Sequence, residues 1–287
     1  MTDDPFVAHR SLLFTVAYEM LGSAADAEDV VQETWLRWAD VDQAQVHQAR
    51  AYLVQMVTRL ALNQLRSVSR RREDYVGEWL PEPLLTRPDV AEDVVLAENV
   101  SIAMLTVLET LGPAERAVFV LREVFDVPYD EIAETIGKTP AAVRQIAHRS
   151  REHVAARRPR MQVDPSEQLT VVEKFLAAVS TGDLKGLMKV LAPDVVAIAD
   201  GGGVVPATRK PIIGAEKLAE SLARLKEAPG FVATTAWVNG MPGARFDFDG
   251  ATAAVSLVVE DGRITHLYAI NNPHKLGSLD KEVELHR

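Results

Sequence analysis

The side chains best suited to chemistry follow Thr139, in a stretch where apolar residues recur at helical spacing. The inward side of this helix is predicted to hold Val143, Ile146, Ala147, Ser150 and Val154, which leaves Arg144, Gln145, His148, Arg149 and Arg151 outward or along the flank. Arginine and glutamine read base edges through paired hydrogen bonds in the major groove, while flanking arginines bind phosphates. The pattern predicts a helix that reads DNA; the alternative is a solvated basic face on an ordinary helical hairpin.

A group of carboxylates lies on a second predicted helix, over residues 26–38, with Ser23 before it as a capping residue. Its acidic residues are Asp26, Glu28, Asp29 and Glu33. A metal site would need further ligands, and there is no histidine beside these carboxylates. The remaining interpretations are a solvated face and a docking surface for a basic partner. Trp35 and Trp38 are predicted to support the core of the first domain.

A third group consists of a glycine-rich stretch, which is free in its backbone, and a proline-containing stretch, which is stiff. Gly201, Gly202 and Gly203 follow Asp200 at the end of a predicted strand, and glycines allow close approach of another segment or an anion. Upstream, Trp79 and the stretch 81–83 form a stiff apolar segment that can dock on such a loop or on the helical domains. A flexible surface loop and a simple spacer are the alternatives.

The elements that position these groups indicate a multidomain chain. A length of 287 residues exceeds what one hydrophobic core usually supports. Helical spacing is predicted over residues 5–72, with a long helix over 48–69, and again over 90–111. Gly112 and Pro113 open the next helix, and helices over 130–136 and after Thr139, joined at Gly137, form a helix-turn-helix. Prolines between residues 79 and 88 mark a linker.

Beyond residue 166 the pattern becomes mixed. Helices are predicted over 168–180, 183–191 and 215–226, and strands over 195–199, 231–238, 251–259 and 264–270. Hairpin dipeptides at 239–240 and 261–262 favour a mostly antiparallel sheet in an α+β domain.

Composition narrows the possible functions. There is no cysteine, which excludes disulfides and thiolate metal sites, and no apolar run approaches the length of a membrane span. A cytoplasmic protein is expected. The net charge of −10 argues against binding DNA alone, but arginines cluster near residues 66–72 and 144–160. Two basic faces on an acidic body favour DNA binding when a partner holds both faces in place.

The motifs of the first 160 residues resemble a known family. Residues 27–35, AEDVVQETW, look like the polymerase-binding stretch of a sigma-2 domain, and residues 50–66 look like its promoter-melting stretch. Residues 111–158 resemble a sigma-4 domain. The chain thus resembles an extracytoplasmic-function sigma factor, group IV of the sigma-70 family, which implies that core RNA polymerase and promoter DNA are its partners.

The resemblance also implies roles for individual residues. Contacts to the clamp helices of core polymerase fall to Asp26, Asp29, Gln32 and Glu33, and contacts to the minus-10 element fall to Asn63, Arg66, Arg70 and Arg71. The helix after Thr139, with Arg144, Gln145, His148, Arg149 and Arg151, is implied to read the minus-35 element, with the sigma-4 domain at the polymerase flap.

Three further motifs resemble a subgroup whose members carry a SnoaL-like extension. They are WLPEP at 79–83, DGGG at 200–203 and NPHKL at 272–276, where the subgroup usually has Asp in place of His274. The resemblance implies a cone-shaped domain, regulation in cis and no membrane anti-sigma partner. It assigns regulatory contacts to Trp79, Pro81, Glu82, Pro83, Asp200, Gly201, Gly202, Gly203, Asn272 and Pro273.

Cone-shaped folds often enclose a pocket, so an enzymatic interpretation is also considered. Tyr268, His266, Trp237 and Asp200 are its candidates, but their spacing establishes no acid–base pair. Strand alternation places His266 and Tyr268 on the face of Ile264. We expect no catalysis, no metal and no cofactor, and a degenerate pocket used for contact or for sensing a small ligand.

The predicted architecture is therefore two all-α sigma domains followed by an α+β cone-shaped SnoaL-like domain. The predicted boundaries are 1–75 for sigma-2, 76–100 for the linker, 101–160 for the sigma-4 helix-turn-helix and 166–287 for the regulatory domain. The predicted function is promoter-specific transcription initiation. The alternatives are a one-component regulator that binds DNA alone, with a C-terminal sensor domain, and an isomerase or hydrolase fused to a DNA-binding module.

Overall fold

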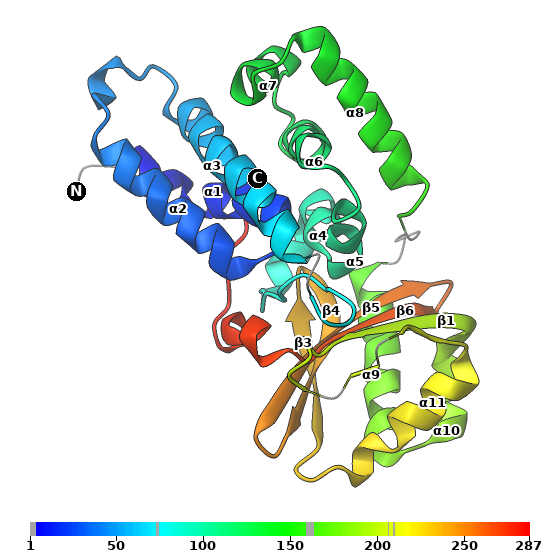
Figure 1. The fold of residues 1–287 in the computed structure, drawn as a ribbon. Coiled ribbons are helices and arrows are strands. Elements are labelled where there is room, and N and C mark those ends of the chain that lie inside the picture. Colours follow the sequence, from blue (N-terminus) through cyan, green and yellow to red (C-terminus); the bar gives the residue numbers. More distant parts are fainter. Residues whose placement is uncertain (1–3, 73–74, 159–163, 206, 209) are drawn as a thin grey trace. The chain divides into compact units, whose positions relative to one another are not determined.

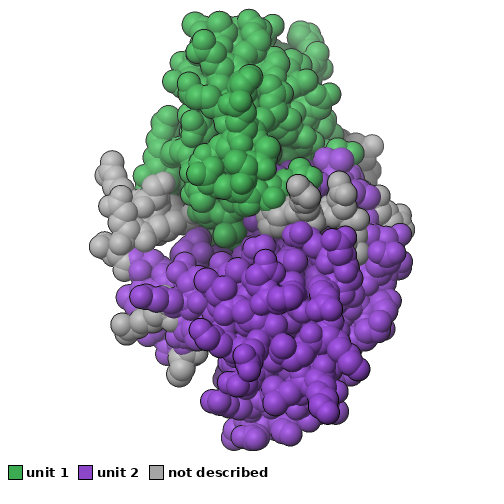
Figure 2. All heavy atoms as spheres, turned by 90° about the vertical axis from the view of Figure 1, so that its right-hand side faces the viewer, with its two compact units in different colours: residues 1–73, 105–158, 284–287 green, residues 74–104, 159–283 purple. Residues whose placement is uncertain are grey.

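The computed structural model describes residues 4–72, 75–158, 164–205, 207–208 and 210–287. The chain divides into two compact units, coloured separately in Figure 2. Unit 1 comprises residues 1–73, 105–158 and 284–287, and unit 2 comprises residues 74–104 and 159–283. The segment between the two predicted sigma domains thus groups with the C-terminal domain. None of the described helices is long and apolar enough to cross a membrane.

The first half of unit 1 is built from α1 (Pro5–Leu21), α2 (Ala24–Ala39) and α3 (Ala49–Arg72), with a short 3₁₀ turn at Gln43–Gln45 (Figure 1). The predicted cap of α2 is confirmed, because the Ser23 hydroxyl accepts a hydrogen bond from the Asp26 amide at 3.1 Å. Most of α1 is buried, and Leu13, Val16 and Ala17 are fully inaccessible. A helix that is apolar on most sides is the one that its neighbours enclose.

The second half of unit 1 contains α6 (Pro113–Phe119), a π-helical turn (Val120–Val124), α7 (Tyr129–Ile136) and α8 (Pro140–Ala155). Its helix-turn-helix forms as predicted. Gly137 ends α7 in the left-handed region with φ 68°, where glycine carries no side-chain penalty. The Thr139 hydroxyl accepts from the Ala142 amide at 3.2 Å and caps α8.

The continuous helical run predicted over 90–111 is wrong. The chain forms a 3₁₀ turn (Pro88–Glu92), α4 (Val94–Val100) and α5 (Ile102–Leu108), with a break at Ser101. Ser101 has an extended ψ of 146°, and its hydroxyl accepts from the Met104 amide at 3.2 Å. Serine competes with the helical backbone in this way, so it ends one helix and caps the next.

The sheet of unit 2 contains, among the described residues, β1 (Leu191–Asp200), β2 (Ile212–Ile213), β3 (Val232–Val238), β4 (Met241–Phe248), β5 (Ala251–Glu260) and β6 (Arg263–Ile270). The strand order is β2-β1-β6-β5-β4-β3, with β1 and β6 parallel and the other neighbours antiparallel, as the mostly antiparallel prediction requires. Strand β4 was not predicted, because Pro242 and Gly243 interrupt its apolar pattern.

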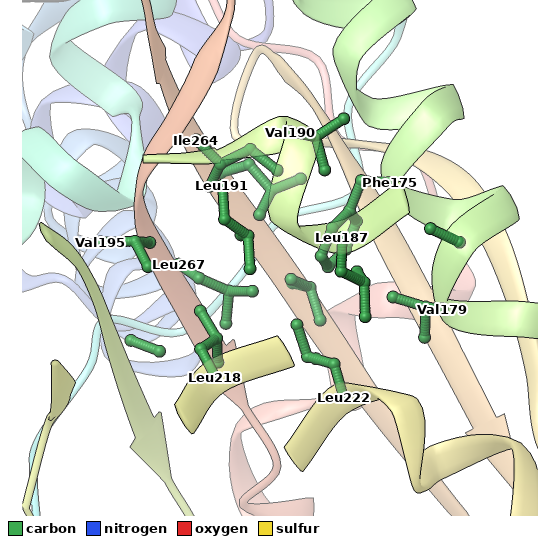
Figure 3. Packing of buried hydrophobic residues seen from close by; sticks show 14 of the residues in the cluster. Phe175, Val179, Leu187, Val190, Leu191, Val195, Leu218, Leu222, Ile264 and Leu267 are labelled. Carbon is green, nitrogen blue, oxygen red and sulfur yellow. The ribbon is translucent and has the colours of Figure 1, made fainter. Parts of the chain in front are cut away.

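One face of this sheet packs on helices α9 (Pro165–Thr181), α10 (Leu184–Val190) and α11 (Ala215–Ala223). Figure 3 shows Phe175, Leu187 and Leu222 from these helices gathered against side chains of the sheet. The opposite face carries a second cluster, in which Leu80 of the linker and Ile102 of α5 pack on Val258 and Tyr268. Both faces of β5 and β6 are therefore covered.

The prediction that Ile264 and Tyr268 point to the same face of the sheet is wrong. Ile264 belongs to the helix-side cluster, whereas Tyr268 belongs to the linker-side cluster. The pairing of β5 with β6 shifts register between Val258 and Val259, so strict alternation fails there. An irregularity of this kind transfers the following side chains to the other face.

Candidate functional site

Helix α8 presents the predicted DNA-reading side chains on one exposed face. Its buried residues are Val143, Ile146, Ala147, Ser150 and Val154, and its exposed residues include Arg144, Gln145, His148, Arg149 and Arg151. Acidic neighbours lie beside several of the exposed ones: Arg151 is 3.4 Å from Glu123, Arg149 is 3.9 Å from Glu115 and His148 is 3.2 Å from Glu152. These exposed ion pairs are weak enough to exchange for phosphate contacts.

Helix α3 presents the predicted minus-10 residues. Asn63 and Arg66 are exposed, and the side chains of Arg70 and Arg71 lie outside the described residues. Arg59, one turn before Asn63, donates hydrogen bonds to the carbonyl oxygens of Glu134 and Thr135, each at 3.3 Å. The two halves of unit 1 are thereby joined, because these carbonyls lie at the end of α7.

The acidic helix α2 is only partly available for docking. Asp29 and Gln32 are exposed, and Glu33 pairs with Arg37 at 2.8 Å on the surface. Asp26 is half-buried and accepts a hydrogen bond from Gln64 of α3 at 2.9 Å, so it fixes α2 against α3.

The prediction for the two tryptophans of α2 is right for one and wrong for the other. Trp38 is 1% exposed and donates to Asp4 at 3.2 Å. Trp35 is 47% exposed because it lies on the outer face of the helix. It enlarges the outward face that also carries Asp29 and Gln32.

In unit 2, the Asp200 side chain is the centre of a buried polar cluster. Its two carboxylate oxygens accept from the Tyr75 hydroxyl at 2.5 Å, the Leu80 amide at 2.9 Å, the Gly202 amide at 3.0 Å and Lys275 Nζ at 2.7 Å. All four donors suit an ionised carboxylate. Asp200 thus connects the linker, the glycine loop and the segment after β6.

Lys275 completes this cluster. Its ammonium group donates to the Leu80 carbonyl oxygen at 2.5 Å and lies 3.1 Å from the centroid of the Trp79 ring. Lys275 is 4% exposed and Asp200 is 0% exposed, so both charges are withdrawn from water. A buried charge needs pairing and hydrogen bonds, and both are provided here.

Asn272 and Tyr75 form the rim of the cluster. Asn272 donates to the Tyr75 hydroxyl at 2.8 Å, and burial, followed by the hydrogen bond to Asp200, raises the pKa of Tyr75 above its usual value. Gly202 and Gly203 have φ values of 60° and 71°, and a Cβ on Gly202 would collide with Asn272, while one on Gly203 would press on Val76. The glycines are therefore needed for this close approach.

The remaining predicted regulatory residues are distributed around the cluster. Pro81 and Pro83 are buried, Trp79 and Glu82 are half-buried, Gly201 is buried and Pro273 is exposed. Sequence reasoning missed Tyr75 and Lys275. Lys275 lies within the NPHKL motif, and no acidic residue stands beside it in the sequence. That absence was the available indication that the lysine pairs with a carboxylate from a distant segment.

Asn239 binds the linker at a second place. The turn between β3 and β4 places it at φ 54° with its side chain fully buried. Its Oδ1 accepts from the Leu84 amide at 2.8 Å, and its Nδ2 donates to the Val100 carbonyl at 2.7 Å. The Thr86 amide donates to the Trp237 carbonyl at 2.9 Å. The linker's main chain is thus bound as a partner strand would be.

The four residues considered for catalysis lie in different surroundings. The Asp200 carboxylate is hydrogen-bonded within the polar cluster, and the Trp237 carbonyl accepts a hydrogen bond from the amide of the linker residue Thr86. His266 and Tyr268 stack with ring centroids 6.2 Å apart, and burial lowers the pKa of His266 and raises that of Tyr268 to about 12. No group of three or more potential metal ligands occurs among the residues that the structure describes.

Comparison with known proteins agrees with this geometry. The family described as Sigma-70 region 2 matches residues 6–71, and Sigma-70, region 4 matches residues 101–154. The ECF RNA polymerase sigma factor SigJ of Mycobacterium tuberculosis H37Rv is 38% identical over 294 residues, covering 96% of this chain and 94% of that protein. The probable ECF RNA polymerase sigma factor SigI of M. tuberculosis CDC 1551 is 35% identical, with coverage of 96% and 95%.

The crystal structure of the M. tuberculosis extracytoplasmic function sigma factor SigJ extends the match to the fold. It superposes with a TM-score of 0.77 at 36% identity, covering 95% of this chain and 97% of that one. Regions 2 and 4 on a helical unit define a sigma-70-type transcription factor. More narrowly, this chain belongs to the extracytoplasmic-function sigma factors, and its C-terminal part folds as an α+β domain. The family acts in transcription initiation and is not enzymatic.

Proposed function

We propose that this protein binds core RNA polymerase through α2, reads the minus-35 element with α8 and opens the minus-10 element with α3. The exposed face of α8 supports this proposal, because it combines Arg144 and Gln145 with arginines suited to phosphate. The outward face of α2, with Asp29 and Gln32, supplies a surface for the polymerase. With a net charge of −10, specific binding depends on the polymerase.

We further propose that the SnoaL-like domain regulates initiation in cis by holding the linker. The observation that carries this proposal is the capture of the linker's main chain: the amides of Leu80, Leu84 and Thr86 all donate to unit 2 acceptors beyond the linker. Residues 75–86 lie in the segment that joins the two sigma regions, so the path of this segment limits the separation that the DNA-binding faces can reach. This contact takes the place of a separate membrane anti-sigma partner.

Transcription with purified core polymerase tests the first proposal. Genomic fragments are transcribed with the full chain, and start sites are mapped by sequencing. Replacing Arg144 and Gln145 with Ala is expected to lower specific initiation by about tenfold or more, since each paired base contact is worth roughly 1–3 kcal/mol. Association with core in a pull-down is expected to remain unchanged. Absence of core-dependent initiation from every fragment would contradict the proposal.

A linker-release variant tests the second proposal. Asn239→Gly keeps the left-handed turn but removes both hydrogen bonds to the linker. We expect promoter-specific initiation to change by about threefold or more, because each lost hydrogen bond is worth roughly 1 kcal/mol. Val232→Ala, at an exposed position of β3, is the matched control. Equal initiation by all three proteins would count against regulation through the linker.

The one-component alternative makes a different prediction. A regulator of that kind binds its DNA site tightly without polymerase and has no use for the exposed carboxylate of Asp29. Charge reversal by Asp29→Lys separates the two functions: it is expected to weaken association with core and to leave DNA binding by the free chain unchanged.

A further inference from the structure

A cavity of about 610 Å³ lies on the helix side of the sheet in unit 2. Small side chains on the strands leave this space open: Ala197 and Ala199 on β1, Ala253 on β5 and Ala269 on β6 all line it. Strand pairing aligns Ala199 with Ala269, Ala269 with Val255, and Ala253, two residues before Val255, with Phe246, so these residues share one face. The volume falls within the range of small-molecule sites in proteins.

The chemistry of the cavity wall is uncharged. Among the described lining residues there is no Asp, Glu, Lys, Arg or His. Phe246 and Phe248 provide aromatic surface, and Thr208, Ser221 and Asn271 provide uncharged polar groups. A charged ligand would lose its hydration without gaining a counter-charge, whereas an apolar ligand with one or two polar groups suits this lining.

The wall of the cavity next to the glycine loop is shared with the linker site. Ala199, Val205 and Ala207 line the cavity, and the same residues line a second space of about 320 Å³ together with Val76 and Gly77 of the linker. The Val205 amide donates to the Gly201 carbonyl at 3.1 Å, which ties this wall to the glycine loop. The cavity and the space beside Val76 therefore share one wall.

A second connection passes through Asn271. Asn271 lines the cavity, and its backbone amide donates to the Asp200 carbonyl oxygen at 2.8 Å. The next residue, Asn272, donates to the Tyr75 hydroxyl. A molecule in the cavity thus lies against two segments that also hold the linker.

We propose that this cavity binds an uncharged, largely apolar small molecule, and that its binding orders the wall formed by Ala199, Val205, Ala207 and Thr208 and tightens the hold on the linker. The first part stands on the cavity alone; the second part rests on the proposed regulation in cis. Ligand binding that orders a shared wall stabilises the second contact made by that wall, which is positive coupling between the two sites.

Binding to the full-length chain is measured with two uncharged probes, decanol and naphthalenemethanol, by displacement of Nile red fluorescence. Decanoate and naphthoate are their charged counterparts. At least one uncharged probe is expected to bind about tenfold or more tightly than its carboxylate counterpart, because the lining offers no cation. Failure of both uncharged probes to bind, or equal binding of the carboxylates, would overturn the proposed site.

Two variants locate the binding. Ala253→Phe fills the cavity, and Ser221→Trp narrows it from an exposed position on α11, where folding is not at risk. Both are expected to abolish probe binding, while Val232→Phe, exposed and away from the lining, keeps it. Unchanged probe binding by Ser221→Trp and Ala253→Phe would place the probe elsewhere and overturn the assignment.

Hydrogen exchange of the backbone amides of residues 76–86, read by mass spectrometry, tests the coupling. Saturating probe is expected to slow exchange in this segment by about threefold or more, because it includes the Leu80, Leu84 and Thr86 amides. Probe binding without slower exchange would overturn the proposed coupling to the linker, while the assignment of the binding site would stand. Neither measurement uses polymerase, so failure here is distinguishable from failure of the proposed transcription function.

Discussion

Two buried carboxyl groups, one in each unit, are equally inaccessible to water, but only one of them accepts hydrogen bonds from described residues. In unit 2, Asp200 and Lys275 are paired at 2.7 Å, and both carboxylate oxygens of Asp200 accept hydrogen bonds. In unit 1, Glu19 and Arg116 are 0% and 1% exposed. Arg116 donates to the Glu19 main-chain carbonyl at 2.9 Å and to Glu109 at 2.7 Å, but neither carboxyl oxygen of Glu19 has a hydrogen-bond partner among the described residues.

The lack of hydrogen bonds to the Glu19 carboxyl within the described ranges is accompanied by shifted pKa values of Glu19 and Arg116. Burial raises the pKa of Glu19 well above its ordinary value, and the charge of Arg116 opposes that change only partly. Burial lowers the pKa of Arg116 to about 9, so the guanidinium is still cationic at neutral pH. A nearby opposite charge therefore does not by itself stabilise a buried carboxylate; hydrogen bonds to the charged form decide. The Asp200 centre joins three segments through hydrogen bonds, whereas the Glu19 carboxyl makes none with the part of the chain that the structure describes.

The largest expected effect is that of Asp200→Ala. It leaves the Lys275 ammonium buried under Trp79 with no carboxylate, and removing one partner of a buried pair costs about 3–5 kcal/mol. Urea unfolding followed by tryptophan fluorescence measures the loss in the free energy of unfolding. Asp280→Ala is the control, since its carboxylate is exposed and 3.4 Å from Arg245.

A double replacement sharpens this prediction. Asp200→Leu combined with Lys275→Met removes both charges, and such apolar replacements recover much of the loss from a single substitution. A single Asp200→Ala variant with a cost below about 1 kcal/mol would show that the Asp200 centre resembles an exposed pair.

The opposite sign is expected for Glu19→Gln. The folded-state pKa of Glu19 is raised above its unfolded value, so the folded state binds the extra proton. Stability from this group is fully present below the unfolded pKa, near 4.5, and is lost as pH rises through the folded pKa. At pH near 8 Glu19→Gln is expected to be more stable than the parent, because the neutral amide carries no charge that folding must bury.

The gain for Glu19→Gln is expected to shrink toward pH 4.5, where the parent carboxyl is protonated. Unfolding curves at several pH values measure this trend. Glu28→Gln is the control, because Glu28 is half exposed and pairs with Arg10 at the surface. A gain for Glu19→Gln that stays constant with pH would mean that proton binding is not its cause.

The sequence predicts the helices well and the contacts between distant segments poorly. Ser23, Gly137 and Thr139 act within a few residues of where they stand, so local patterns predict the caps and turns. The exposed face of α8 follows from helical spacing alone. The register shift in β6 and the break at Ser101 depend on hydrogen bonds that spacing does not reveal.

The linker site was predicted only in part. Asp200, Asn272 and the glycine loop were chosen from motifs, but the partners Tyr75 and Lys275 are 125 and 75 residues from Asp200. One signal was available: Val258 and Ile270 are apolar on the sheet face opposite the helices, and an apolar face must be covered. That signal predicts a cover without identifying the linker as its source.

The smallest expected effect belongs to an exposed pair in the same region. Arg87 of the linker segment and Glu282 are 2.8 Å apart, and their side chains are 52% and 51% exposed. This pair joins the linker to the C-terminal segment, as the Asp200 centre does, but water screens it. A double-mutant cycle of Arg87→Ala and Glu282→Ala is expected to give a coupling free energy of about 0.5 kcal/mol or less.

This cycle separates burial from location as the source of stability. The main-chain hydrogen bond from the Val283 amide to the Leu85 carbonyl, at 2.8 Å, is retained in both variants, so the position of the segment is held while the charges are removed. The coupling is expected to fall further as salt is raised, because exposed charges are screened over about 10 Å at 0.1 M. Arg87 and Glu282 take part in the linker contact as the Asp200 centre does, but they are not buried. A coupling free energy as large as that expected for Asp200, and insensitive to salt, would therefore mean that the location of the pair, and not its burial, determines its strength.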